Sequence, residues 1–354
     1  MKLPVVPTVA PMLAKLAREL PVGEYLYEPK WDGFRAIVFR DGDEIEIQSR
    51  GEKSFNRYFP ELETALAEQL PQRIVVDGEI VIATDHGLDF DLLSLRIHPA
   101  ASRIDLLADE IPASFVAFDM LAEADDDLCA VGFAERRARL ERALAGVRPP
   151  IHVTPVTTDP DVGATWFERF EGAGLDGVIA KPTAGTYAPG KRTLLKVKHQ
   201  RTADCVVAGY RSHKESGVGS LLLGLYDAQE VLHHVGVASS FKADLRAQLA
   251  EELAPLEVDA LDGHPWRGWG DADAHDAGQR MPGGPSRWNA TKDLSWTPVR
   301  VERVAEVAYE HLQADRFRHT ARFVRWRPDK GPAECTYAQL DAPVPAELAE
   351  VFGL

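Results

Sequence analysis

One lysine near the beginning of the chain, Lys30, has neighbours that suit nucleophilic chemistry. It lies in the segment YEPKWDGFR, residues 27–35, directly before a predicted strand. A lysine amine can attack the α-phosphorus of a nucleotide to form a phosphoramidate, but only when it is unprotonated, and the ordinary lysine pKa is about 10.4. Partial burial and nearby cations both lower that pKa. Such a lysine therefore needs cationic neighbours, and Arg35, Lys196 and Lys198 are the candidates.

Other charged and aromatic residues fall near the ends of predicted strands in the first half. In LLKVK, Lys196 and Lys198 share one face of a strand because side chains alternate with a period of two. Cations could offset charge on phosphoryl oxygens, carboxylates could hold Mg²⁺ or a ribose hydroxyl, and a phenylalanine could stack on a purine. Taken singly, each group also suits a plain turn or an exposed strand face. The remaining members of the set are Asp32, Arg50, Asp77, Glu79, Phe118, Asp119, Asp176 and Lys181.

The distribution of charge indicates where a polyanion could bind. The net charge of −15 argues by itself against nucleic acid as a partner, because binding DNA depends on Lys and Arg contacts with phosphates. The basic residues are concentrated, however: residues 191–214 hold seven against one acid, and residues 316–330 hold six against one. Two confined positive segments favour local polyanion sites, with solvated basic faces as the alternative.

The cysteines and the amino terminus bear on the compartment. The three cysteines are far apart and form no CxxC pair, which argues against a zinc site and a disulfide framework. The first residues are interrupted by prolines and followed by a charged, helix-like segment, so they do not suit a signal peptide. No run approaches the roughly 18 apolar residues of a membrane span. We expect a cytoplasmic protein with no membrane partner.

The 354 residues suit two domains of about 100 to 200 residues each. Residues 1–200 are predicted to form an α+β domain with antiparallel sheets. Alternating residues on either side of DGD predict a hairpin over residues 34–49, and Pro60 precedes a helix whose apolar face includes Leu62, Leu66 and Leu70. Further strands are predicted at 73–83, 114–121, 176–182 and 193–199, and helices near 135–145 and 163–173.

Residues 201–354 show a different sequence pattern from the first half. Short strands with glycine-bearing turns, one helix at 241–253 and a basic edge favour a small closed barrel of the oligonucleotide-binding (OB) kind. A Gly-, Pro- and Trp-rich stretch at 261–288 interrupts the pattern. Its tryptophans, at positions 266, 269 and 288, could stack on bases or cover the barrel.

The segment KWDGFR at 30–35 resembles the KxDGxR nucleophile motif of the covalent nucleotidyltransferases, the superfamily of polynucleotide ligases and mRNA capping enzymes. Later segments match that superfamily in order, and within it the chain most resembles bacterial ATP-dependent DNA ligases of the ligase C group. The superfamily matches are SR at 49–50, DGE at 77–79, FD at 118–119, DGVIAK at 176–181, LLKVK at 194–198 and RWRPDK at 325–330. The group matches are RYFPEL at 57–62, KDLSWTPVRVE at 292–302 and RFRHTARFVRWRPDK at 316–330.

The resemblance implies a nucleotidyltransferase (adenylation) domain followed by an OB-fold domain, with ATP and Mg²⁺ or Mn²⁺ as cofactors. It implies that Lys30 takes AMP from ATP. Arg35 and Arg50 would contact the nucleotide or the 5′ phosphate of DNA. Glu79 would serve the ribose or the metal, and Phe118 would stack on adenine.

For the other matched positions, the resemblance implies that Lys196 and Lys198 contact the α-phosphate and that Glu28 lies near the adenine. Arg327, Asp329 and Lys330 would come from the second domain and orient pyrophosphate in the first step only, which requires that domain to close and reopen.

Two positions depart from the commoner family pattern. Asp176, expected as a metal ligand beside Glu79, stands where many relatives carry glutamate. Because its side chain is shorter, its carboxylate reaches less far toward a metal. SRGE replaces the more frequent SRNG, so the contact of that asparagine cannot be assigned to Gly51.

The function implied is sealing of nicks in duplex DNA through lysyl-AMP and then DNA-adenylate, in DNA repair. We expect a monomer that binds nicked duplex DNA, with DNA repair proteins as further partners. An RNA ligase or a capping guanylyltransferase using the same lysine is the alternative within the superfamily. A catalytically silent nucleic-acid binding module is the alternative from another class.

Overall fold

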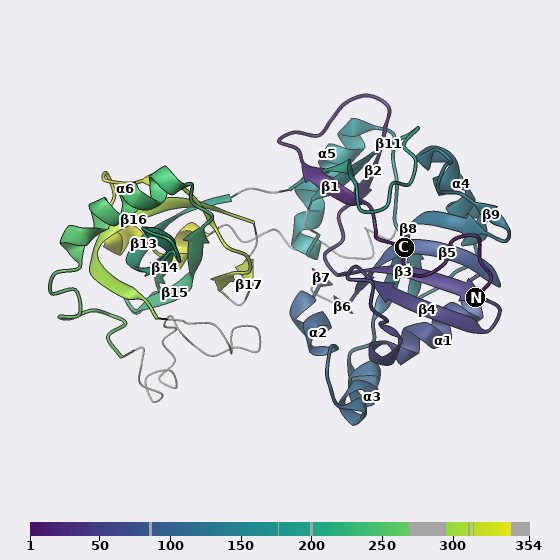
Figure 1. The fold of residues 1–354 in the computed structure, drawn as a ribbon, viewed down its shortest axis with the longest axis horizontal. Coiled ribbons are helices and arrows are strands. Elements are labelled where there is room, and N and C mark those ends of the chain that lie inside the picture. The colour runs from purple at the N-terminus through teal and green to yellow at the C-terminus, as the bar shows by residue number, and fades with distance from the viewer. Residues whose placement is uncertain are drawn as a thin grey trace. The chain divides into compact units, whose positions relative to one another are not determined.

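The computed structural model describes residues 1–84, 87–175, 177–198, 201–268, 295–310, 312–313 and 315–340. These form two compact units, one ending at Lys198 and one that follows it (Figure 1). Each unit has its own hydrophobic core. Among the described helices, none has the length and apolar character needed to cross a membrane.

A six-stranded sheet forms the larger part of the first unit, with a main path β10-β8-β5-β3-β4 and β9 beside β8. The predicted hairpin is confirmed: β3 and β4 pair in antiparallel register from Ala36 opposite Ser49 to Asp41 opposite Glu44, and Gly42 supplies the turn with a φ of 66°. The strands are β3 (Phe34–Asp41), β4 (Glu44–Ser49), β5 (Arg73–Val81), β8 (Ser114–Glu123), β9 (Asp126–Asp127) and β10 (Ile151–Val153).

A smaller sheet in the same unit has the order β1-β12-β11-β2. Its strands are β1 (Leu13–Leu16), β2 (Tyr25–Pro29), β11 (Val178–Pro182) and β12 (Arg192–Val197). The helix-like interpretation of the amino-terminal segment was wrong here, because Leu13–Leu16 pairs in parallel with the open edge of β12. The chain then passes from β2 in this sheet to β3 in the larger one through residues 30–33, which include Lys30.

Helices and short elements surround these sheets. The helix predicted after Pro60 is confirmed, with Leu62 and Leu66 buried. The last predicted helix of the unit begins three residues earlier than expected, because Asp159 caps it and Pro160 starts it. The elements are η1 (Asn56–Tyr58), α1 (Pro60–Gln69), β6 (Ala83–Thr84), β7 (Gly87–Leu88), α2 (Phe90–Leu95), α3 (Ala101–Glu110), α4 (Phe133–Ala143), α5 (Pro160–Arg169) and η2 (Phe170–Ala173).

The described part of the second unit contains an antiparallel five-stranded sheet in the order β15-β14-β13-β16-β19. An isolated parallel bridge links Ala238 of the edge strand β15 to Ala321, directly before the other edge strand β19, a contact that the expected barrel requires. Trp266 is fully buried in this core and donates to the Leu232 carbonyl, so it covers the barrel; positions 269 and 288 lie outside the described residues. The elements are β13 (Arg201–Ser212), β14 (Val218–Tyr226), β15 (Leu232–Ser239), α6 (Ala243–Leu253), η3 (Ala254–Leu256), β16 (Thr297–Tyr309), β17 (Leu312–Gln313), β18 (Arg316–Phe317), β19 (Arg322–Trp326), η4 (Pro332–Glu334) and η5 (Tyr337–Gln339).

Candidate active site

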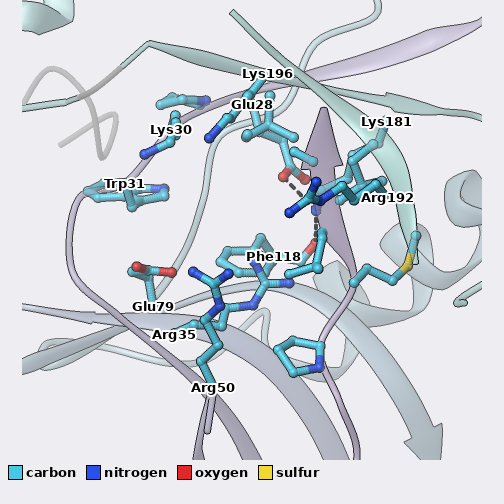
Figure 2. Close-up of a pocket in the computed structure, with 17 residues that line it drawn as sticks. Glu28, Lys30, Trp31, Arg35, Arg50, Glu79, Phe118, Lys181, Arg192 and Lys196 are labelled. Carbon is cyan, nitrogen blue, oxygen red and sulfur yellow. Dashed lines mark hydrogen bonds and ion pairs between the residues drawn. The ribbon is translucent and has the colours of Figure 1, made fainter. Parts of the chain in front are cut away.

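A cavity of about 260 Å³ in the first unit is lined by residues of both sheets. Figure 2 shows the side chains arranged around a common space. Seven of the predicted site residues line it: Glu28, Lys30, Arg35, Arg50, Glu79, Phe118 and Lys196. Lys181, a member of the charged set noted in the sequence but given no role there, also lines it, as do Trp31 and Arg192, which were not predicted as site residues.

Lys30 is held by its own backbone N–H and by the anchored side chain of the next residue, Trp31. Its own N–H donates to the carbonyl of Gly177 at 2.8 Å, and the indole N–H of Trp31 donates to the Thr154 hydroxyl at 2.8 Å. The turn that follows needs a glycine at position 33, since a Cβ there would collide with the Ile80 carbonyl oxygen. A Cβ at Gly177 would likewise collide with the Val197 carbonyl. Both motif glycines therefore permit a close backbone approach that fixes the lysine.

Arg35 is oriented by a carboxylate from the neighbouring strand. Its Nε and Nη2 lie 2.6 and 2.7 Å from the two oxygens of Asp77, which also accepts from the Tyr187 hydroxyl at 2.7 Å. Burial opposes the charge on Arg35, but the adjacent Asp77 carboxylate outweighs it and raises the pKa of the guanidinium. The aspartate of DGE thus positions the arginine of KxDGxR, a relationship that the sequence did not reveal.

Glu79, two residues after Asp77, faces the cavity (Figure 2). Burial raises the pKa of its carboxyl to about 7, against the opposing influence of Arg35 and Lys30. Within the part of the chain that the structure describes, no group of three His, Cys, Asp or Glu side chains could hold a metal. Glu79 is a single carboxylate facing the cavity, and Mg²⁺ is commonly bound by one or two carboxylates together with substrate phosphates. Asp176, the other predicted metal ligand, lies outside the described residues.

Glu28 belongs to a buried ionic cluster in the wall of the cavity. One carboxylate oxygen lies 2.7 Å from the Lys181 ammonium, and the other accepts from Arg137 on α4 at 3.2 Å. Burial lowers the pKa of Lys181, and Glu28 partly offsets that effect. Arg137 also donates to the backbone carbonyl of Thr154, whose hydroxyl accepts from Trp31. The cluster therefore ties together the residues on both sides of Lys30.

Phe118, expected to stack on a purine, is buried and already contacts two cations. The guanidinium carbon of Arg35 lies 4.2 Å from the ring centroid, and the Lys181 ammonium lies 4.6 Å from it. Contacts of this kind are electrostatically favourable. A purine that stacked on the face occupied by Arg35 would have to displace its guanidinium.

Alternate residues of β12 bring further cations to the cavity. Arg192, Leu194 and Lys196 line it because every second residue of a strand shares one face. The strand ends at Val197, so this alternation does not extend to Lys198, which is not among the lining residues. Arg50, in the turn directly after β4, is exposed, and its backbone N–H donates to the Arg35 carbonyl at 3.1 Å.

The remaining predicted residues, Arg327, Asp329 and Lys330, belong to the second unit. Arg327 contacts both Asp204 and Asp329, at 2.8 and 2.9 Å, and the Lys330 ammonium lies 2.9 Å from Asp204. The two cations are therefore neighbours that share one carboxylate.

Comparisons with known proteins show which families this chain is similar to. The family described as the ATP dependent DNA ligase domain matches residues 10–198, and the ATP dependent DNA ligase C terminal region matches residues 214–330. DNA ligase C2 of Mycolicibacterium smegmatis is 56% identical over 345 residues, covering 97% of each chain. DNA ligase C of Mycobacterium tuberculosis is 55% identical over 359 residues, covering 99% of each. A solved Lig E DNA ligase, 18% identical, has a similar fold, with a TM-score of 0.54 and coverage of 90% of this chain and 100% of that one.

Proposed function

The chain belongs to the family of ATP-dependent DNA ligases, and from that premise we propose that it seals nicks in duplex DNA in three steps. First, the Lys30 amine forms a bond to the α-phosphorus of ATP while the bond to pyrophosphate breaks. The AMP then passes to the 5′ phosphate of the nick, releasing Lys30. Finally, the 3′ hydroxyl attacks that 5′ phosphate, the phosphodiester forms and AMP departs.

The observation that carries this proposal is the concentration of cations around Lys30 within one cavity. Arg50, Arg192 and Lys196 all line the space that Lys30 faces (Figure 2). Phosphoryl transfer needs a positioned nucleophile and positive charge near the phosphoryl oxygens. We assign Lys196 to the α-phosphate; the same role for Lys198 stays a prediction. Arg35 and Arg50 are assigned to the nucleotide or the 5′ phosphate.

The two acidic lining residues have different roles in this proposal. Glu28 is already paired with Lys181 and Arg137, so it shapes the cavity behind Lys30, where the adenine is expected. Glu79, the other carboxylate of the described cavity lining, is assigned to the ribose or a divalent cation. When bound, Mg²⁺ or Mn²⁺ would neutralise charge on the triphosphate. Arg327 and Lys330 are assigned to pyrophosphate during the first step.

The experiment that tests the proposal supplies the nucleotide and the polynucleotide in turn. The protein is incubated with Mg²⁺ and ATP or GTP, and then with a nicked DNA duplex or a duplex nicked in an RNA strand. We expect ATP-dependent sealing of nicked DNA, lost in Lys30→Ala and retained in Lys53→Ala, which alters an exposed lysine outside the cavity. Use of GTP would indicate a capping-type enzyme, sealing of RNA alone an RNA ligase, and no nucleotide transfer a binding module.

We propose further that the protein acts as a monomer, with repair proteins as its partners.

A further inference from the structure

Asp204 in the second unit joins the two cations that the proposed reaction places on pyrophosphate. Its carboxylate oxygens lie 2.9 and 2.8 Å from Nη1 of Arg327, and one of them lies 2.9 Å from the Lys330 ammonium. The Asp204 side chain is only 12% exposed, and those of Arg327 and Lys330 are 21% and 22% exposed. Two positive charges this close would repel each other without the carboxylate between them.

Asp204 is itself held rigidly. It lies on β13, where it is paired with Glu306 of β16. Its backbone N–H donates to the side-chain oxygen of Gln339 at 2.7 Å, and its carbonyl accepts from the Gln339 amide nitrogen at 3.1 Å. The Asp204 carboxylate therefore has a fixed position on the sheet. Arg327 and Lys330, from the segment after β19, both donate to it.

The guanidinium of Arg327 donates hydrogen bonds to two carboxylates, one largely buried and one exposed. Nη1 contacts Asp204, whereas Nε and Nη2 contact Asp329 at 3.0 and 2.9 Å. Asp329 is 60% exposed, so water or an incoming anion can reach this edge of the guanidinium. Exposed ion pairs contribute little to stability, typically less than about 1 kcal/mol. The pairing with Asp204 can thus persist while a phosphate replaces Asp329.

We propose that Asp204 is a positioning residue for the adenylation step, holding Arg327 and Lys330 together in the arrangement that binds pyrophosphate. The inference rests on the proposed function of those two cations. It predicts a role in the step that releases pyrophosphate and in its reversal. It predicts no role in the final step, in which pyrophosphate takes no part.

The test compares Asp204→Asn with Glu302→Gln, which removes the charge from another carboxylate of the unit that holds an arginine, Arg300, at 2.6 Å. Three rates are measured: formation of enzyme-AMP over a range of ATP concentrations, loss of AMP from adenylated enzyme on adding pyrophosphate, and sealing of a nick that already carries a 5′-adenylate. We expect Asp204→Asn to lower the first two about tenfold or more and the third less than about twofold. Glu302→Gln should stay within about twofold throughout.

A general structural defect would lower all three rates together and reduce the melting temperature. Asp204→Glu, which keeps the charge, should recover part of the adenylation rate. Unchanged adenylation, or an equal loss in all three assays, would overturn the role of Asp204 while leaving the ligase function intact. A wild-type protein that neither takes up AMP nor seals the adenylated nick would overturn the proposed function itself, and this inference with it.

Discussion

The guanidinium of Arg35 and the carboxylate of Asp77 face each other across neighbouring strands, with two hydrogen bonds of 2.6 and 2.7 Å. Arg35 is opposite Glu79 in the register of β3 and β5, so Asp77 reaches it diagonally. The pair aligns an arginine of the nucleophile motif beside Phe118. It connects the DGE segment on β5 to β3, the strand that follows Lys30.

We expect Asp77→Ala to lower the free energy of unfolding by about 3 to 5 kcal/mol, because it leaves a largely buried arginine without its partner. Denaturant unfolding measures this loss. The matched control is Asp125→Ala, whose carboxylate pairs with Arg73 but is 85% exposed, and which should cost less than about 1 kcal/mol. Equal losses in the two variants would show that the Arg35–Asp77 pair contributes no more to the free energy of unfolding than an exposed ion pair does.

Glu79 predicts a pH dependence of stability. Its pKa of about 7 in the folded protein is above the ordinary value near 4.5, so the folded state binds the proton more tightly than the unfolded state. The stabilisation that protonated Glu79 contributes is fully present below about pH 4.5 and is lost as the pH rises through about 7. Across that window wild-type stability should fall relative to Glu79→Gln by up to about 3 kcal/mol, less where water in the cavity screens the charge. Parallel stability curves for the two proteins would contradict this.

Gly33→Ala should destabilise the turn that carries Lys30, because the added Cβ meets the Ile80 carbonyl. Overpacking against backbone costs about 1 to 3 kcal/mol, and the shift of the turn should slow enzyme-AMP formation as well. Gly51→Ala serves as the control, since nothing lies within 4 Å of the position of its Cβ. The prediction fails if both alanine variants melt at the wild-type temperature.

The two lysines of LLKVK should differ in how much they contribute to the rate of enzyme-AMP formation. Lys196→Met removes a cation from the cavity lining and should slow enzyme-AMP formation by about tenfold or more. Lys198→Met alters a residue after the end of β12 and should have a smaller effect. Single-turnover labelling with ATP compares them. An equal loss for Lys198→Met would show that both ammonium groups reach the α-phosphate during the reaction.

Much of the site could be predicted because its residues stand at strand ends, where local pattern is informative. The hairpin of residues 34–49 and the strand containing Lys196 follow from alternation, and matched motifs then placed Lys30 and Glu79 together. The pattern was less informative for the amino-terminal segment, since Leu13–Leu16 forms a strand only because β12 offers it an edge.

The ionic cluster around Glu28 could not be predicted in the same way. Its partner Arg137 is 109 positions away and lies on a helix where a charged residue usually indicates a solvated face. Only the packing of α4 against the sheet brings that arginine inside. Arg192 was counted as part of a basic segment, but its place in the cavity depends on the register of β12 with β11 and β1.

The central claim is that Lys30 carries the AMP. Incubation with ATP and Mg²⁺, followed by protease digestion and tandem mass spectrometry, locates the adduct directly. The account predicts one AMP on Lys30, formed with ATP, removed by adding pyrophosphate, and absent in Lys30→Ala. An adduct on another residue, or a Lys30→Ala protein that still acquires AMP covalently, would contradict it.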